Sequence, residues 1–237
     1  MADIATLLEH PEDLKFAFQP VIHAHSGEIY GYEALMRPMP FSPMDVVDHC
    51  IQNGCVDRLE EITMMYAIKA FLRNRLEGKI FINSFPGACM SRDFSTLWLE
   101  EVGHTIAGRI VLEMLEYTDL KVEVWNRKLE EFERGNRGTG NTSHIAIDDY
   151  GVDSDIDLAR IAMYRPTMIK IDRSLIEHID TDPEKQERVN RTIRLMQEKH
   201  ILILAEGVET REEYDYFRSL PIDYMQGYYI KKPEIYP

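Results

Sequence analysis

The feature that most constrains the fold is a repeated alternation of short apolar runs with amphipathic segments of helical periodicity. Most of the apolar runs are rich in β-branched and aromatic residues, as β-strands prefer. The expected strands cover residues 16–21, 30–36, 79–84, 109–115, 144–150, 168–172, 201–206 and 224–229. Strands alternating with helices in this number, on a chain of 237 residues, predict an α/β fold: a TIM-like (β/α)8 barrel.

Helical segments are expected between most of these strands. Residues 43–53 form the clearest one, because Ser42 and Pro43 supply an N-cap and a first-turn proline, and Gly54 can end the helix. The remaining helices are expected in a lead-in within 1–14, along a continuous apolar face at 59–70, and near 91–102, 119–134, 153–164, 184–199 and 209–219.

One connection departs from a regular barrel pattern. The first two expected strands are joined only by HAHSGE at 23–28, which is far too short for a crossover between parallel strands. We therefore expect a β-hairpin, with the first strand antiparallel to its neighbour. No linker, internal repeat or low-complexity tract divides the chain, so residues 1–237 are expected to form a single domain.

The charge balance narrows the classes of partner. The chain has 41 acidic and 27 basic residues, a formal charge of −14, which argues against binding DNA, RNA or anionic membranes in general. A small anionic ligand held by a few arginines or by metal ions stays open. Three cysteines are too few for a disulfide framework, and no apolar run approaches the ~20 residues of a membrane span. We expect a cytoplasmic protein without a membrane segment.

Polar residues recur where the expected strands end. In a TIM barrel the catalytic groups gather at the C-terminal ends of the strands. A single polar strand end can be purely structural, but a series of them favours a functional site. The residues concerned are Glu33, Asn83, Glu113, the adjacent pair Asp148 and Asp149, Lys170, Glu206 and Gln226.

This set has the chemistry of a divalent-metal site. Several carboxylates cannot remain ionised together without cations, and carboxylate and amide oxygens suit Mg²⁺, Mn²⁺ or Ca²⁺. Asp148 and Asp149 could each face a different ion, or share them, as hydrolysis of a phosphodiester by two metal ions requires. Lys170 would add a fixed positive charge near the attacking hydroxide or the phosphate.

The same residues lie in motifs that resemble those of a known family. YEALMRP at 32–38 looks like the signature of EAL domains, phosphodiesterases that open the cyclic dinucleotide c-di-GMP to linear pGpG. The family fold is a TIM-like barrel with an antiparallel first strand, in agreement with the hairpin argument. Further similar motifs follow through nearly the whole chain: FQP (18–20), LEMLE (112–116), IDDYG (147–151), IKIDRSLI (169–176), AEGVET (205–210) and QGYYIKKP (226–233).

The resemblance implies a metal-dependent hydrolysis of c-di-GMP by a two-metal mechanism at the C-terminal mouth of the barrel. Glu33, Asn83, Glu113 and Asp148 would ligate one ion, and Asp149 would serve the second. The ions would be Mg²⁺ or Mn²⁺, and Ca²⁺ is expected to be inhibitory. The partner would be c-di-GMP, and a homodimer is among the assemblies that the family pattern allows.

The resemblance also implies roles for residues that do not hold metal. Lys170 would contact the nucleophilic water, and Gln226 would position water or substrate. Glu206 would act near the metals as a ligand or as the general base, and the group that takes the proton from water stays open. Arg37 would bind a substrate phosphate by bidentate hydrogen bonds, and Gln19 is assigned to substrate binding.

A loop departs from the family pattern. The DDFG-like motif usually continues T-G-Y-S-S, but here the segment from Val152 to Ile156 reads V-D-S-D-I, without the second glycine. Glu116 matches the glutamate that braces this loop in the family. The departure keeps an alternative open, a catalytically silent module that binds c-di-GMP or a protein partner in signalling. An unrelated TIM-barrel metalloenzyme is a third hypothesis.

Overall fold

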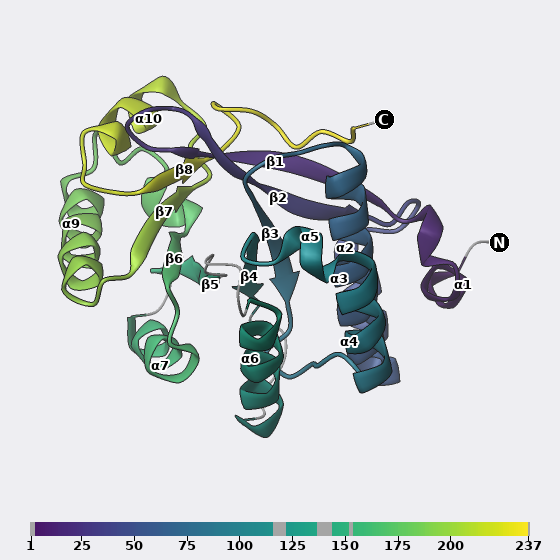
Figure 1. Ribbon diagram of the computed structural model, residues 1–237. Helices are drawn as coiled ribbons and strands as arrows, with labels where there is room; N and C mark the ends of the chain where they lie inside the picture. Colours follow the sequence, from purple (N-terminus) through teal and green to yellow (C-terminus); the bar gives the residue numbers. More distant parts are fainter. Residues whose placement is uncertain (1–2, 116–121, 137–143, 152–153, 237) are drawn as a thin grey trace. The chain divides into compact units, whose positions relative to one another are not determined.

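The computed structural model describes residues 3–115, 122–136, 144–151 and 154–236 (Figure 1). The strands within these residues follow one another in chain order as a closed barrel, which confirms the predicted TIM-like architecture. β1 (Lys15–His23) pairs antiparallel with β8 (Tyr224–Gln226), which confirms the antiparallel first strand. The strands are β1 (Lys15–His23), β2 (Ile29–Arg37), β3 (Lys79–Ser84), β4 (Ile110–Met114), β5 (His144–Tyr150), β6 (Met168–Ile171), β7 (Leu202–Glu206) and β8 (Tyr224–Gln226).

Most predicted helices are present within a few residues of their expected bounds. The lead-in contains α1 (Ile4–Glu9) and a short 3₁₀-helix (Pro11–Asp13). Two helices of three and four residues, α5 (His104–Ile106) and α8 (Arg173–Ile176), were not predicted, because they are too short to show an apolar period. The helices are α1 (Ile4–Glu9), α2 (Pro43–Asn53), α3 (Val56–Arg73), α4 (Arg92–Trp98), α5 (His104–Ile106), α6 (Val122–Asn136), α7 (Ser154–Tyr164), α8 (Arg173–Ile176), α9 (Pro183–Glu198) and α10 (Arg211–Arg218).

Two predicted elements end several residues earlier than expected. The helix predicted at 91–102 is regular only as α4, and a π-helix at Leu99–Gly103 follows it. The last strand was predicted to reach residue 229 but ends at Gln226. The chain turns back there, since the Tyr229 N–H donates to the Val208 carbonyl at 3.0 Å.

Two further observations concern the cysteines and the described helices. Cys50, Cys55 and Cys89 are all free thiols. None of the described helices has the length and hydropathy needed to cross a bilayer.

The described chain divides into two compact units, which are considered one at a time. The first unit comprises Met1–Phe18, Glu33–Ser143 and Glu234–Pro237, and the second comprises Gln19–Tyr32 and His144–Pro233. Each unit is assembled from segments that are distant in the sequence. The assignment of residues 1–237 to a single domain stays a prediction.

In the first unit, β3 and β4 run parallel and side by side, with α3 packed along β3 (Figure 1). The register places Asn83 of β3 opposite Glu113 of β4, at the C-terminal ends of both strands. Apolar side chains such as Phe71 and Phe81 are fully buried around these strands. The two polar ends are therefore carried on rigid, buried strands.

The caps predicted for α2 are present in the same unit. The Ser42 hydroxyl accepts the Asp45 N–H, and the Asp45 carboxylate accepts the Ser42 N–H in return, which is a capping box. Gly54 ends the helix in the left-handed conformation, with φ of 65°. Local side-chain chemistry thus sets both ends of α2.

In the second unit, β5 to β8 form a continuous parallel series, and α9 packs against β7 (Figure 1). The end of β1 closes antiparallel onto β8, with His23 opposite Tyr224. The predicted hairpin is closed by the His23 N–H, which donates to the Glu28 carbonyl at 2.9 Å. The C-terminal ends of β5 to β8 therefore lie at one edge of this unit.

Gly227 is a position where this unit tolerates no side chain. A Cβ there would collide with the backbone of Val208, whose N–H already donates to the Gln226 carbonyl at 3.0 Å. We predict that Gly227→Ala lowers the free energy of unfolding by about 1–3 kcal/mol, because the two loops must separate. Urea denaturation measures this change.

Gly54→Ala is the matched control, because a Cβ at Gly54 would meet open space. The control should lower the free energy of unfolding by roughly 1 kcal/mol, the strain of a positive φ alone. An equal or greater loss of stability in the control would contradict the close-approach argument.

Candidate functional site

Lys170 on β6 is a fully buried cation in the second unit. Its Nζ lies 3.0 Å from Asp148 Oδ1 on β5 and 3.0 Å from Glu206 Oε2 on β7. The three side chains meet because β6 is the parallel neighbour of both other strands. A buried ammonium requires opposite charge close by, and the two carboxylates supply it.

Asp148 keeps its charge in this setting. Its burial by itself would raise the pKa, because burial penalises the charged form. The charge and hydrogen bond of Lys170, together with hydrogen bonds to Glu206 and to the Asp149 backbone, more than offset that effect, so the pKa of Asp148 lies below its ordinary value. Asp148 is therefore ionised at neutral pH, and the ionised carboxylate is the form that binds metal ions.

Asp149 owes its direction to an irregularity in β5. Adjacent residues of a regular strand point to opposite faces. Here the pairing of β5 with β6 shifts register between Ile147 and Tyr150, and Asp149 has a positive φ of 52°. Asp149 is exposed and lines a pocket that Glu206 also lines. Because of this bulge, Asp148 contacts Lys170 while Asp149 lines the pocket of Glu206, at the same edge of the unit.

This pocket has a volume of about 230 Å³ and gathers several predicted site residues. Gln226 Nε2 donates to Gln19 Oε1 at 3.1 Å, and Gln19 Nε2 donates to the Lys231 carbonyl at 3.1 Å. These bonds orient both amides. The predicted residues lining the pocket are Gln19, Asp149, Glu206 and Gln226, and Arg173 and Tyr228 line it as well.

The loop after Glu206 is held by Glu213, a residue that sequence reasoning missed. The Glu213 carboxylate accepts the N–H groups of Glu209 at 2.8 Å, Thr210 at 3.1 Å and His178 at 3.2 Å. Burial would raise the pKa of Glu213, but these backbone hydrogen bonds hold it below its ordinary value. Thr210 and Glu213 form a capping box for α10, a local sequence signal that could have identified this residue.

Arg173 is a second missed residue, and it acts on the same loop. Its guanidinium donates to the Gly207 carbonyl and lies 3.2 Å from the Glu209 carboxylate. Arg173 and Glu213 together hold the first residues after Glu206 through both N–H and carbonyl groups. No local pattern in the sequence indicated the role of Arg173.

The loop whose sequence departs from the EAL pattern is described at its two ends. Asp157 is buried, and its Oδ2 accepts the Gly151 N–H at 2.7 Å. Arg188 donates to the Gly151 carbonyl at 2.8 Å. Val152 and Asp153 lie outside the described residues, as does Glu116, the predicted bracing residue. Both the N–H and the carbonyl of Gly151 are therefore held by hydrogen bonds.

The first unit contains three predicted metal ligands. Glu33 is 5% exposed and Glu113 is fully buried, while Asn83 is partly exposed. Asn83 also lines a largely apolar pocket of about 180 Å³ together with Arg37, the predicted phosphate-binding residue. The Arg37 guanidinium donates to the Met36 carbonyl at 3.0 Å. A cation and an amide thus face an apolar pocket.

The five predicted ligands are divided between the two units. Glu33, Asn83 and Glu113 belong to the first unit, and Asp148 and Asp149 belong to the second. Across the described ranges, no group of three or more His, Cys, Asp and Glu side chains is arranged to hold a metal ion. Joint metal ligation by these five residues stays a prediction.

Comparison with known families and proteins gives consistent matches. The family model described as EAL domain matches residues 2–233. The chain is 27% identical to "Probable cyclic di-GMP phosphodiesterase PdeG" of Escherichia coli, over 92% of this chain and 44% of that protein. It is 26% identical to "Cyclic di-GMP phosphodiesterase NbdA" of Pseudomonas aeruginosa, over 94% of this chain and 29% of that protein. The chain therefore spans less than half the length of these relatives.

Solved structures share the fold. An EAL domain protein from Listeria monocytogenes superposes with a TM-score of 0.77 at 21% identity, covering 98% of this chain and 92% of that one. A standalone EAL protein from Vibrio cholerae, in a c-di-GMP-bound form, gives 0.75 at 25% identity, covering 94% and 93%. BlrP1 of Klebsiella pneumoniae, in a manganese and c-di-GMP complex, gives 0.77 at 22% identity, covering 94% and 56%.

The hydrogen bonds of Glu213 generate a pH-dependent prediction. Because the pKa of Glu213 is lower in the folded than in the unfolded protein, its stabilisation is complete above the ordinary glutamate pKa. It is lost as the pH falls through the folded pKa. We predict that Glu213→Gln lowers the free energy of unfolding by about 1–3 kcal/mol at pH of about 7, because buried N–H groups lose a charged acceptor.

The measurement is urea denaturation of both proteins at a series of pH values. The difference in stability between wild type and Glu213→Gln should shrink as the pH falls through the folded pKa of Glu213. Glu212→Gln, an exposed neighbour on the same helix, is the control. A difference that does not change with pH would contradict a charged Glu213.

Proposed function

This chain belongs to the EAL domain family, and from that premise we propose that it is a metal-dependent phosphodiesterase that opens c-di-GMP to linear pGpG. The relatives named as cyclic di-GMP phosphodiesterases support this substrate. The observation that carries the proposal is Lys170, a buried ammonium within 3.0 Å of Asp148 and Glu206. A fixed cation in a water-poor site favours the negative charge that develops on an attacked phosphodiester.

Each residue of the second unit has a proposed task. Lys170 would stabilise the attacking hydroxide and keep Asp148 ionised. Glu206 both contacts Lys170 and lines the pocket, so it would lie between the ammonium and the bound phosphodiester. Gln226, oriented by its hydrogen bond from Nε2 to Gln19, would position water or substrate.

The donor set fits hard divalent cations. Glu33, Asn83, Glu113, Asp148 and Asp149 offer only carboxylate and amide oxygens, the ligands that Mg²⁺ and Mn²⁺ prefer. When bound, two such ions would lower the pKa of water and neutralise charge on the phosphate. We propose that these five side chains supply the ligands, and that the larger Ca²⁺ ion binds without supporting turnover. The manganese and calcium complexes of BlrP1 with the dinucleotide support metal use in the family.

Substrate binding is proposed for the two pockets. In the first unit, Arg37 would exchange its bond to the Met36 carbonyl for a substrate phosphate, a stronger charge-assisted partner. The apolar wall of that pocket, which includes Pro43 and Met44, suits the flat face of a base. The pocket of the second unit would receive phosphodiester oxygens near Gln19 and Gln226.

A second candidate function is a silent module that binds c-di-GMP or a protein partner without hydrolysing the dinucleotide. The observation that favours it is the pairing of both Asp148 and Glu206 with the same ammonium, Lys170. The altered sequence after Gly151 points in the same direction. Metal binding would then require these carboxylates to change partners.

The proposal also covers the cellular compartment and the assembly of the protein. Three free thiols suit a reducing compartment, so we place the activity in the cytoplasm. A homodimer is proposed as its assembly. The two relatives named above extend well beyond the region that this chain matches. We therefore include regulation by further domains in the proposal.

The activity is predicted to depend on Glu33. Purified protein with c-di-GMP and Mg²⁺ or Mn²⁺ should release linear pGpG, resolved by chromatography. Glu33→Ala should lower turnover at least about 100-fold, because it removes a buried carboxylate from the proposed ligand set. Glu101→Ala, which removes a partly exposed carboxylate on the same unit, should leave turnover unchanged.

The alternative gives a different result in the same assay. Binding of c-di-GMP by the wild-type protein with no pGpG in either metal would establish the silent module and reject the phosphodiesterase.

Lys170→Met is predicted to lower kcat by about 10²–10³-fold, because the fixed positive charge is lost from the site. The pKa of Asp148 should rise in this variant, since burial is then no longer offset by the ammonium. Mn²⁺ binding should consequently require a higher pH than in the wild type. Mn²⁺ titrations at several pH values measure this shift, and an unchanged pH dependence would contradict the role assigned to Lys170.

A further inference from the structure

A second buried ion pair lies in the first unit, between α3 and α6. The Lys128 Nζ is 2.7 Å from Glu60 Oε1, and the two side chains are 7% and 2% exposed. A cavity of about 20 Å³ borders both residues, enough for roughly one water molecule. Neither residue belongs to the predicted site or to any motif of the sequence.

The pair holds the residues that directly follow Asn83. Lys128 donates to the Ser84 hydroxyl at 2.8 Å and to the Phe85 carbonyl at 2.7 Å. Glu60 accepts the Ser84 hydroxyl at 2.6 Å and the Phe85 N–H at 3.0 Å. Four hydrogen bonds from two buried charges therefore fix the end of β3.

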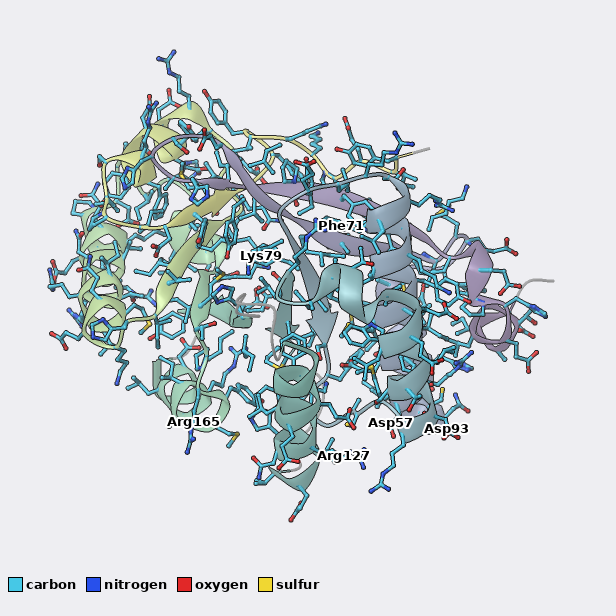
Figure 2. The ribbon with its side chains drawn as sticks, viewed as in Figure 1. Asp57, Phe71, Lys79, Asp93, Arg127 and Arg165 are labelled. Carbon is cyan, nitrogen blue, oxygen red and sulfur yellow. The ribbon has the colours of Figure 1, made fainter. Side chains whose placement is uncertain are left out.

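Two neighbouring carboxylates of α3 hold the loop that continues from Phe85. Asp57 accepts the Cys89 N–H at 3.1 Å, and Glu61 accepts the Ser91 N–H at 3.0 Å. Arg127 of α6 donates to the Cys89 sulfur at 3.1 Å, so α3 and α6 both contact this loop. Figure 2 labels Asp57 of α3 and Arg127 of α6. Among these carboxylates of α3, Glu60 is the buried one and the one that contacts the residues next to Asn83.

The position of the pair relates it to the proposed metal ligands. Alternation along β3 directs Ser84 and Asn83 to opposite faces, so Ser84 meets the helices while Asn83 lines the Arg37 pocket. The Ser84 carbonyl accepts the Leu115 N–H at 3.0 Å, which links the end of β3 to the end of β4. Glu113 lies opposite Asn83 in the same parallel pair.

Stability alone gives little reason for these charges. A buried ion pair can often be exchanged for apolar residues without loss of stability, because burying the charges offsets their attraction. Partners outside the ligand set, by contrast, commonly set metal affinity by orienting the ligands. We propose that Glu60 and Lys128 are positioning residues that hold the strand ends carrying Asn83 and Glu113. This inference rests on the proposed function of those two ligands.

The test uses the double variant Glu60→Leu with Lys128→Met in the full chain. Lys128→Met alone would leave an unpaired buried carboxylate and strongly destabilise the protein, whereas the double variant removes both charges together. The first measurement is hydrogen exchange of peptides covering residues 82–86, which is independent of activity. Exchange there should be about tenfold faster than in wild type, while peptides from α9 stay unchanged.

The second measurement is the Mn²⁺ concentration that gives half-maximal turnover. It should rise about 10–100-fold in the double variant, with kcat at saturating Mn²⁺ largely retained. Glu60→Gln with Lys128→Met should restore part of the Mn²⁺ affinity, because an amide can still accept the Phe85 N–H and contact the Ser84 hydroxyl. A merely stabilising pair would leave the Mn²⁺ dependence as in wild type.

The outcomes separate this inference from the proposed function. Wild-type exchange rates at 82–86 in the folded double variant would overturn the positioning role, whether or not the protein is an enzyme. A wild type without turnover would reject the proposed function, and the exchange measurement would still decide the role of the pair. The control is Lys69→Met with Glu101→Gln, a partly exposed pair of the same unit, which should change neither measurement.

Discussion

The need to neutralise a buried ammonium organises the candidate site. Lys170 has no exposed surface, so its charge needs partners of opposite charge, and Asp148 and Glu206 supply two of them from the two adjacent strands. That requirement constrains the register of β5, β6 and β7 and keeps Asp148 ionised. The same arrangement supplies the fixed charges that phosphodiester chemistry needs, so the stability and the proposed function of this unit share one interaction.

The first unit uses a buried lysine in a different way. Lys128 pairs with Glu60, and both form further hydrogen bonds with Ser84 and Phe85 rather than with a residue of the proposed site. Lys170 faces the residues proposed for catalysis, whereas Lys128 faces the backbone behind a proposed ligand. Both follow the same rule, since a buried charge must find partners and those partners become fixed in place.

Elements with local signals were predictable. The strands follow from apolar runs, the hairpin from a connection too short for a crossover, and the ends of α2 from Ser42 and Gly54. The end of β8 was predicted too late, because its apolar sequence continues while the chain turns to meet Val208. Arg173 and the Glu60–Lys128 pair escaped prediction because their partners are distant in the sequence; Glu60 and Lys128 are 68 residues apart.

The sequence by itself determined the order of the strands, the polar residues that end them and the family resemblance of IDDYG. It also determined that Asp148 and Asp149 are consecutive at the end of an apolar strand. Only the tertiary structure decided the direction of each of these two side chains. A regular strand would send them to opposite faces, and the register shift against β6, with the positive φ of Asp149, brings Asp149 to the pocket of Glu206. Register depends on pairing with a distant strand, and so it is not written in the residues of β5 alone.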